Sequence, residues 1–261
     1  MLRRVIISAL VSLVVAAPSW AQIATDFTPP ASACCLLTSA ERLAQQLQDW
    51  NQLGRYSKAN QQLKAAPREP KRVVFMGDSI TDFWKLDQSF PGKSYVNRGI
   101  GGQTTAQMLV RFYPDVIALE PAAVVIFAGT NDIARNNGMQ TMEMIQQNIM
   151  AMVDLAKAHK IKVVLCALTP INDYKKLSAQ QGGGPNLQSK ARPPADILAL
   201  NAWLKSYAAS VGAQYADYHS ATRDADGFLV DADTGDGLHP NASGYAKMAP
   251  VVTAAIEAAL K

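Results

Sequence analysis

Asp236 and His239 stand three residues apart near the end of the chain, and this spacing is chemically useful. On a turn, the carboxylate can accept a hydrogen bond from Nδ1–H of the imidazole, which fixes the tautomer and leaves Nε2 free to take a proton. The pair therefore predicts a general base that is oriented by an acid. Of the three histidines, His219 is the competing base but lacks this spacing, and His159 follows a helical pattern.

A candidate nucleophile, Ser79, follows the first short apolar run, residues 72–76, and comes directly after Gly77 and Asp78. A serine hydroxyl at the end of a strand can attack a carbonyl carbon when a base is close. Many serines in this position are only helix caps. The segment is not a G-x-S-x-G elbow either, because Thr81 stands where the second glycine would be. Ser79 alone does not decide between the two interpretations.

Two further loops carry groups that could stabilise a negative charge. Gly101 and Gly102 follow the second apolar run and can let a backbone N–H approach a reacting oxygen, although a plain glycine turn is an equal alternative. Thr104 replaces the third glycine of a phosphate-binding G-x-G-x-x-G pattern, which excludes that pattern. Asn131 follows the third apolar run and offers an amide donor, but asparagine is also a common turn residue.

The elements that must position these residues are indicated by alternating periodicities. The predicted strands are residues 72–76, 94–97, 123–128, 162–168 and 213–218, and the main predicted helices are 105–117, 139–159, 195–211 and 242–260. The alternation indicates βαβ units, and hence an α/β fold with a parallel sheet and helices on both faces. Ligands bind beyond the carboxyl ends of the strands in such sheets. Ser79, the glycine loop and Asn131 all fall at those ends.

The first part of the chain is predicted to precede the α/β domain. Arg3 and Arg4, a following apolar run and a small-x-small site ending at Ala21 are typical of a secretory signal peptide. We therefore expect a secreted or periplasmic protein. The predicted organisation is a signal peptide over 1–21, a flexible segment over 22–37, an N-terminal helical segment over 38–66 and the α/β domain over 70–261.

Composition excludes several functional classes. The chain has 261 residues, 49% of them hydrophobic, and its formal net charge of +4 is not gathered into basic blocks, so we expect no nucleic-acid partner. The apolar run of the signal is too short to span a bilayer, so no stable membrane insertion is expected after its removal.

No His/Cys/Asp cluster has the spacing of metal ligands, and we expect no metal and no cofactor. Cys34 and Cys35 are adjacent, whereas Cys166 lies in a buried-strand pattern and is predicted to be an inert core thiol.

Together, the four blocks resemble those of the SGNH subgroup of the GDSL hydrolases, in the same order. The blocks are Gly77-Asp78-Ser79, Gly102, Gly129-Thr130-Asn131-Asp132 and Asp236-Gly237-Leu238-His239, and the resemblance covers roughly residues 72–259. It implies a three-layer flavodoxin-like parallel sheet of about five strands. It also implies a catalytic triad of Ser79, Asp236 and His239. The implied oxyanion hole consists of the N–H groups of Ser79 and Gly102 and the side chain of Asn131.

Some positions near the motifs carry separate expectations. Ile80 stands where the name-giving motif has leucine, and Gln103 stands where several relatives carry aspartate, a difference that bears on substrate contacts rather than on the triad. We interpret Asp78 and Asp132 as carboxylates that organise loops.

The resemblance implies a serine esterase or acylhydrolase that cleaves carboxylic O-esters through an acyl-enzyme. We expect short acyl groups and an alcohol portion that can be a carbohydrate, so the partner is a small-molecule or glycan ester. The polar loop 171–194 offers little apolar surface for a fatty chain. Its candidates for sugar contacts are Asn172, Asp173, Lys175, Gln180 and Gln181. The alternatives are a lysophospholipase or thioesterase type of lipolytic acylhydrolase and, in a different class, an acyltransferase or a non-catalytic glycan-binding domain.

Overall fold

The computed structural model describes residues 49–175 and 184–261 of the chain. The predicted signal peptide over 1–21, the flexible segment over 22–37 and the two adjacent cysteines lie outside the described residues, as do Gln180 and Gln181. Among the helices that are described, none is long and apolar enough to cross a membrane.

Five parallel strands form one sheet in the order β2-β1-β3-β4-β5. The strands are β1 Val73–Gly77, β2 Tyr95–Gly99, β3 Ala123–Phe127, β4 Lys162–Cys166 and β5 Gln214–Ala216. All residues of β1 and β3 are buried, as their nearly continuous apolar sequences predict for strands covered on both faces. The strand order reverses between β1 and β3, so the crevice at this point is where a flavodoxin-like sheet binds its ligand. The predicted fold is confirmed.

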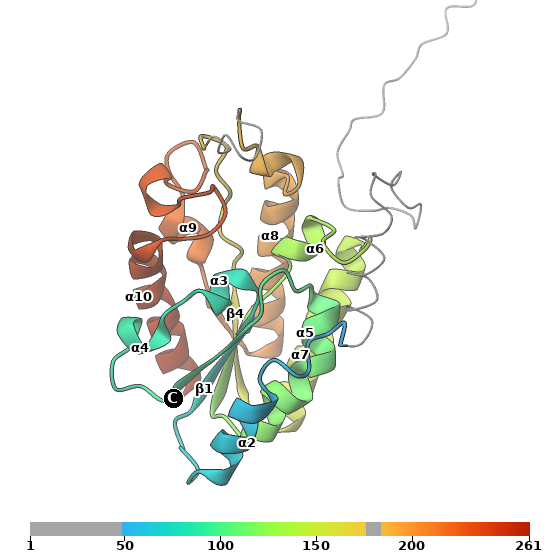
Figure 1. The fold of residues 1–261 in the computed structure, drawn as a ribbon, viewed down its shortest axis with the longest axis vertical. Helices are drawn as coiled ribbons and strands as arrows, with labels where there is room; N and C mark the ends of the chain where they lie inside the picture. The colour runs from blue at the N-terminus through green and yellow to red at the C-terminus, as the bar shows by residue number, and fades with distance from the viewer. Residues whose placement is uncertain (1–48, 176–183) are drawn as a thin grey trace, which may run out of the picture.

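Helices cover both faces of the sheet and make the fold three-layered (Figure 1). Helices α5, α7 and α8 pack on one face, and α9, α10 and the short α3 and α4 lie on the other. The helices are α2 Ser57–Ala65, α3 Ser79–Asp82, α4 Leu86–Ser89, α5 Thr105–Asp115, α6 Thr130–Ile133, α7 Met142–Ala158, α8 Pro194–Val211, α9 Tyr218–Thr222 and α10 Ala242–Ala259. The four main helices predicted from periodicity are therefore present, with ends shifted by a few residues.

In the described part of the N-terminal helix expected over 38–66, only the C-terminal portion, α2 Ser57–Ala65, is helical. Residues 49–56 form turns, and α2 begins only at Ser57. The Asp49 carboxylate accepts hydrogen bonds from the N–H groups of Leu53 and Gly54, both at 2.8 Å, and Gln52 has a positive φ of 57°. These local interactions close a turn that competes with a continuous helix.

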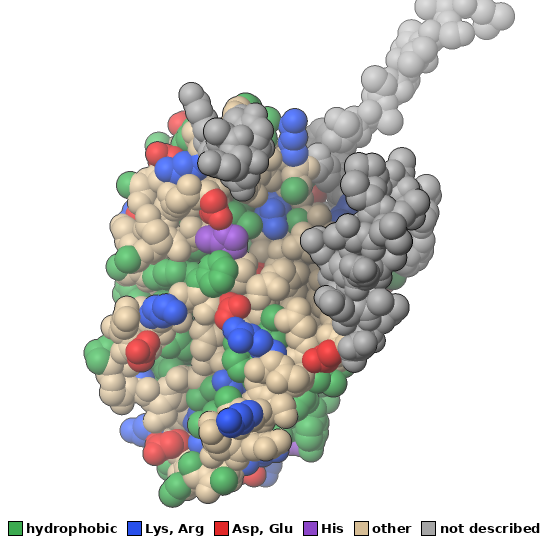
Figure 2. Space-filling view, viewed as in Figure 1, with side chains coloured by type: hydrophobic (Ala, Val, Ile, Leu, Met, Phe, Trp, Pro, Cys, Tyr) green, Lys and Arg blue, Asp and Glu red, His purple; other side chains and the backbone are tan. Residues whose placement is uncertain are grey.

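The distribution of surface charge and the burial of Cys166 both agree with what the sequence predicts for the α/β domain. Basic and acidic side chains are interspersed on the face seen in Figure 2, without a large patch of either sign. Cys166 is buried at the end of β4, and burial raises the pKa of its thiol to about 12. The thiol is therefore protonated at neutral pH, as expected for a core cysteine.

Candidate active site

The turn after β1 carries Ser79 at the mouth of the sheet. Asp78 is the N-cap of α3, and its Oδ1 accepts a hydrogen bond from the N–H of Ile80 at 2.9 Å. The chain reverses so tightly that a Cβ on Gly77 would lie 2.1 Å from Oγ1 of Thr81. Only glycine permits this close approach of strand end and helix. Ser79 is then the first residue of α3 and has 8% of its surface exposed.

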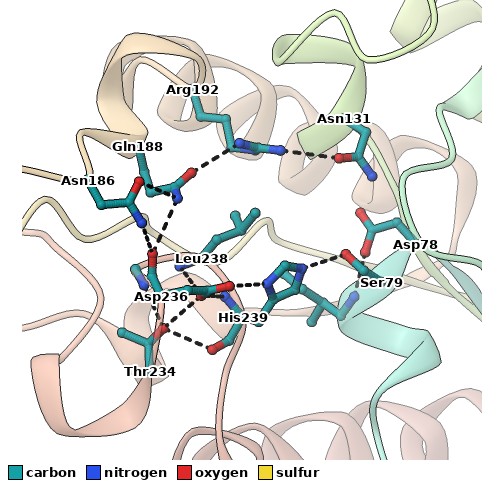
Figure 3. A network of polar contacts seen from close by, with 12 residues as sticks. Asp78, Ser79, Asn131, Asn186, Gln188, Arg192, Thr234, Asp236, Leu238 and His239 are labelled. Atoms are coloured by element: carbon teal, nitrogen blue, oxygen red, sulfur yellow. Dashed lines mark hydrogen bonds and ion pairs between the residues drawn. The ribbon is translucent and has the colours of Figure 1, made fainter. Parts of the chain in front are cut away.

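The loop before α10 brings His239 and Asp236 to this serine. Oγ of Ser79 lies 2.8 Å from Nε2 of His239, and Nδ1 of His239 lies 2.6 Å from Oδ2 of Asp236 (Figure 3). Both distances are those of good hydrogen bonds. Tyr245 of α10 donates to the carbonyl oxygen of Ile80 at 2.8 Å, which ties the helix after His239 to the turn that carries Ser79. The geometry lets the imidazole take the hydroxyl proton while the carboxylate holds the ring.

Asp236 is held in its ionised form by its own loop. Its Oδ1 accepts from the backbone N–H groups of Leu238 at 2.9 Å and His239 at 2.8 Å. Partial burial opposes ionisation, but the hydrogen bonds from the side chain and backbone of His239 and from Leu238 outweigh it and hold the pKa of Asp236 well below its usual range. Thr234 donates from Oγ1 to the carbonyl oxygen of His239 at 2.9 Å and steadies the turn. The carboxylate is therefore charged and fixed in direction at neutral pH.

The two loops singled out as possible oxyanion donors lie beside the serine and each other. A Cβ on Gly101 would be 3.7 Å from Cβ of Ser79, so the glycine loop packs against the turn that carries Ser79. Gly102 has a φ of +78°, which suits glycine. Nδ2 of Asn131, on α6, donates to the carbonyl oxygen of Gln103 at 3.1 Å. Because an amide nitrogen carries two hydrogens, one N–H of Asn131 is left for a ligand.

Two buried carboxylates near the site make the local contacts expected of loop organisers. Asp132 accepts hydrogen bonds from the N–H of Thr105 at 3.0 Å and from its hydroxyl at 2.6 Å, which joins α6 to the start of α5. Asp78 caps α3, as described above. Burial raises the pKa of Asp132 to about 6 and that of Asp78 to about 7.

Gln103 does not face a substrate. Its side chain is buried, its Nε2 donates to the carbonyl oxygen of Asn51 at 2.9 Å, and its Oε1 accepts from Nε of Arg111 at 2.5 Å. The expectation that this position bears on substrate contacts is therefore not supported. The N-terminal turn that contains Asn51 supports the glycine loop from behind, and the sequence carried no signal of this contact.

The loop after β4 also differs from its expected role. Asn172 is fully buried, and its side chain binds the carbonyl oxygen of Leu229 at 2.6 Å and the N–H of Tyr174 at 2.8 Å. It holds the loop and has no surface to offer a sugar. Asp173 accepts from the N–H of Ser189 at 3.0 Å, and Lys175 pairs with Asp231 at 2.9 Å.

Sequence reasoning missed two side chains that lie at the site. Phe83 has 53% of its surface exposed, and its ring centroid is 5.2 Å from that of His239. Arg192, just before α8, donates to Oδ1 of Asn131 at 3.3 Å (Figure 3). Phe83 follows Ser79 by one helical turn, so its proximity could have been inferred from spacing. Arg192 lies in an irregular loop without periodicity, and no pattern indicates where its side chain points.

The other histidines lie elsewhere. His219 is on α9, and in the described part of the chain it makes no hydrogen bond to Ser79; burial lowers its pKa. His159 is the C-cap residue of α7 and packs edge-on against Tyr113. Within residues 49–175 and 184–261, no group of three or more His, Cys, Asp or Glu residues could hold a metal ion.

Comparison with known proteins matches this chain to one family of hydrolases. The sequence model of the GDSL-like lipase/acylhydrolase family matches residues 75–247. A candidate acylhydrolase from Bacteroides fragilis, of known structure, is 41% identical, with a TM-score of 0.72 over 82% of this chain and 99% of that one. A GDSL-like lipase from Bacteroides thetaiotaomicron is 36% identical, with a TM-score of 0.71 over 81% of this chain and 100% of that one.

A curated relative is the acetylxylan esterase of Xylanibacter ruminicola. It is 29% identical to this chain over 230 residues, which make up 74% of this chain and 44% of the esterase. This chain therefore spans less than half the length of that relative.

Proposed function

This chain belongs to the GDSL-like lipase/acylhydrolase family, and from that premise we propose that it is a serine esterase that hydrolyses carboxylic O-esters through an acyl-enzyme. In this proposal Ser79 is the nucleophile, His239 the general base and Asp236 the group that orients it. The observation that carries the proposal is the hydrogen-bonded chain from Oγ of Ser79 through His239 to Asp236, at 2.8 Å and 2.6 Å.

In the first half of the reaction, Nε2 of His239 takes the proton of Ser79 while Oγ attacks the ester carbonyl carbon. The carbonyl oxygen becomes an oxyanion, which the N–H groups of Ser79 and Gly102 and the Nδ2–H of Asn131 would stabilise. The tetrahedral intermediate collapses, the bond to the alcohol oxygen breaks, and His239 passes its proton to that oxygen. The acyl group remains on Ser79.

In the second half, His239 takes a proton from water as the water oxygen attacks the acyl-enzyme. The same donors stabilise the second oxyanion, and the bond to Oγ breaks as His239 returns the proton to Ser79. The products are the carboxylic acid and the free enzyme. Asp236 stays ionised throughout and stabilises the imidazolium in both halves.

The substrate class in this proposal is an ester of a short acyl group, with an alcohol portion that is a carbohydrate. The half-exposed ring of Phe83 beside His239 offers a flat apolar face against which a sugar ring can pack. The similarity to an acetylxylan esterase points to the same class. Because Asn172, Asp173 and Lys175 are engaged within the protein, this support comes from the aromatic ring rather than from the polar loop.

A panel of p-nitrophenyl esters from acetate to palmitate, assayed together with acetylated xylan, tests the activity and the substrate class. We expect hydrolysis that is highest for acetate to butyrate and no activity in S79A. S210A, which removes an exposed hydroxyl on α8, is the matched control and should keep full activity. Activity that survives in S79A contradicts the proposed nucleophile. A rate that climbs steadily with acyl length assigns the enzyme to the lipolytic class instead.

We further propose export to the periplasm or the medium, based on the pattern of residues 1–21. Expression of the full chain in a Gram-negative host, followed by cell fractionation and N-terminal sequencing, tests this. We expect a mature protein that begins at Gln22 outside the cytoplasm. A cytoplasmic protein that keeps Arg3 and Arg4 contradicts the proposal.

A further inference from the structure

Arg192 lies over the site between Asn131 and Asp236 (Figure 3). Only 7% of the surface of Arg192 is exposed. Its Nη2 donates to Oδ1 of Asn131 at 3.3 Å, and its Nη1 donates to Oε1 of Gln188 at 3.2 Å. Arginine side chains are rarely buried to this degree unless they are paired; among the described residues both Nη groups of Arg192 are hydrogen-bonded, whereas its buried Nε has no partner. The position of this guanidinium therefore calls for a role near the oxyanion donor.

The contacts of Asn131 show what that role is. Oδ1 accepts from Nδ2 of Asn136 at 2.8 Å as well as from Arg192, and Nδ2 donates to the carbonyl oxygen of Gln103 at 3.1 Å. If the amide were rotated by half a turn, its NH₂ group would face two donors. The two donors on Oδ1 thus fix the orientation that leaves one N–H of Asn131 for an oxyanion.

The charge of Arg192 adds a second effect. Burial lowers the pKa of Arg192, but nearby Asp78 and Asp236 favour its charged form, and a guanidinium stays protonated at neutral pH. A hydrogen bond from a cation is stronger than one from a neutral donor, and it polarises the amide that accepts it. A polarised amide is a better donor through its own N–H. The positive charge thus strengthens stabilisation of an oxyanion without touching it.

The same arginine is connected to the triad. Nε2 of Gln188 donates to the backbone carbonyl oxygen of Asp236 at 3.3 Å, and Nδ2 of Asn186 donates to the same oxygen at 2.7 Å. A chain of hydrogen bonds therefore runs from the loop of Asp236 through Gln188 and Arg192 to Asn131 (Figure 3). It joins the two sides of the site across the loop that precedes α8.

We propose that Arg192 is a positioning residue of the esterase reaction, which orients and polarises the amide of Asn131 toward the oxyanion and does not bind the substrate. This inference rests on the proposed function of the site. It predicts that replacing Arg192 lowers kcat, and that this loss depends on the presence of Asn131.

The test is a double-mutant cycle on p-nitrophenyl acetate with R192M, N131A and the double variant. Each enzyme is quantified by titration of Ser79 with a fluorophosphonate. R192M should lower kcat by about 10- to 100-fold and leave KM within about twofold, because the interaction matters in the transition state. In the N131A background the same substitution should change kcat by less than about threefold, because the partner through which it acts is gone.

R192K tests the conservative replacement, since one ammonium can reach only one of the two acceptors of Arg192. We expect a kcat between those of the parent and R192M, and R192K carries the test if R192M fails to fold. R68M is the matched control, because Arg68 is an exposed arginine that pairs with Glu120 on the surface, and it should be unchanged.

Three outcomes separate the inference from the proposed function. A raised KM with normal kcat in R192M means that Arg192 binds substrate, and additive losses of kcat in the double variant mean that it acts independently of Asn131. Either result overturns the inference. A parent protein that neither turns over esters nor reacts with the fluorophosphonate overturns the proposed function itself.

Discussion

Asp78 places a carboxyl group in the interior beside Ser79, and its ionisation should govern how the free energy of unfolding depends on pH. The side chain is fully buried and, among the described residues, its Oδ2 has no hydrogen-bond partner. Burial raises the pKa of Asp78 to about 7. An aspartate in an unfolded chain has a pKa of about 3.9, and the difference of about three pH units corresponds to at most about 4 kcal/mol.

The sign follows from proton binding. Between about pH 4 and pH 7 the folded protein keeps a proton on Asp78 that the unfolded chain has released, so the free energy of unfolding falls as the pH rises through this window. Asparagine has no proton to lose, and its amide oxygen can still cap α3 by accepting from Ile80. We expect D78N to be no more stable than the parent near about pH 4, and more stable by up to about 4 kcal/mol near pH 8.

Urea denaturation of both proteins across this pH range, followed by circular dichroism, measures the difference in the free energy of unfolding. The other buried carboxyl groups, Asp132 among them, are present in both proteins, so their contribution cancels in the comparison. D87N removes an exposed aspartate on α4 and controls for the change in net charge. If the difference between D78N and its parent stays constant from about pH 4 to pH 8, the argument from burial is refuted.

Two further predictions concern the assigned roles. N131A should lower kcat for p-nitrophenyl acetate by about 10²–10³-fold, or about 3–4 kcal/mol, with little change in KM, because the donor acts on charge that forms in the transition state. A normal kcat with a raised KM would show instead that Asn131 binds the substrate. H239A should abolish esterase activity while H219A keeps most of it, because only His239 of these two lies within hydrogen-bond distance of Ser79. The reverse result in the same assay would move the base to His219.

The features that could be predicted from the sequence are those determined by residues that lie close together along the chain. Buried strands read as short apolar runs, and a parallel sheet brings their carboxyl ends together, so the apolar runs alone assign Ser79, Gly102 and Asn131 to one edge. The spacing of Asp236 and His239 likewise constrains their contact within a single turn. Their predicted catalytic roles await the mutants described above.

What could not be predicted depends on contacts between distant segments. The composition of the loop after β4 suggested exposed polar groups, but Asn172 turns inward because the backbone groups of Tyr174 and Leu229 need partners there. Gln103 similarly binds Asn51, which is separated from it by 52 residues. Periodicity indicates which face of a helix or strand is apolar. It does not indicate which distant residues a polar side chain will hydrogen-bond to.

The same limit explains why two arginines that frame the site were not predicted from the sequence. Arg111 is fully buried on α5, where Nη2 donates to the carbonyl oxygen of Gly77 at 3.0 Å and Nη1 to that of Arg98 at 2.8 Å. Nη1 of Arg111 also forms an ion pair with Oδ2 of Asp115 at 3.0 Å. A buried guanidinium is tolerated only when its donors are used, so this side chain clamps the ends of β1 and β2 together with the glycine loop. Arg111 thus supports the two candidate oxyanion loops from within the protein, as Arg192 does from the loop before α8. The candidate catalytic groups occupy strand ends that the sequence predicts, while Arg111 and Arg192 hydrogen-bond to the segments that follow those ends.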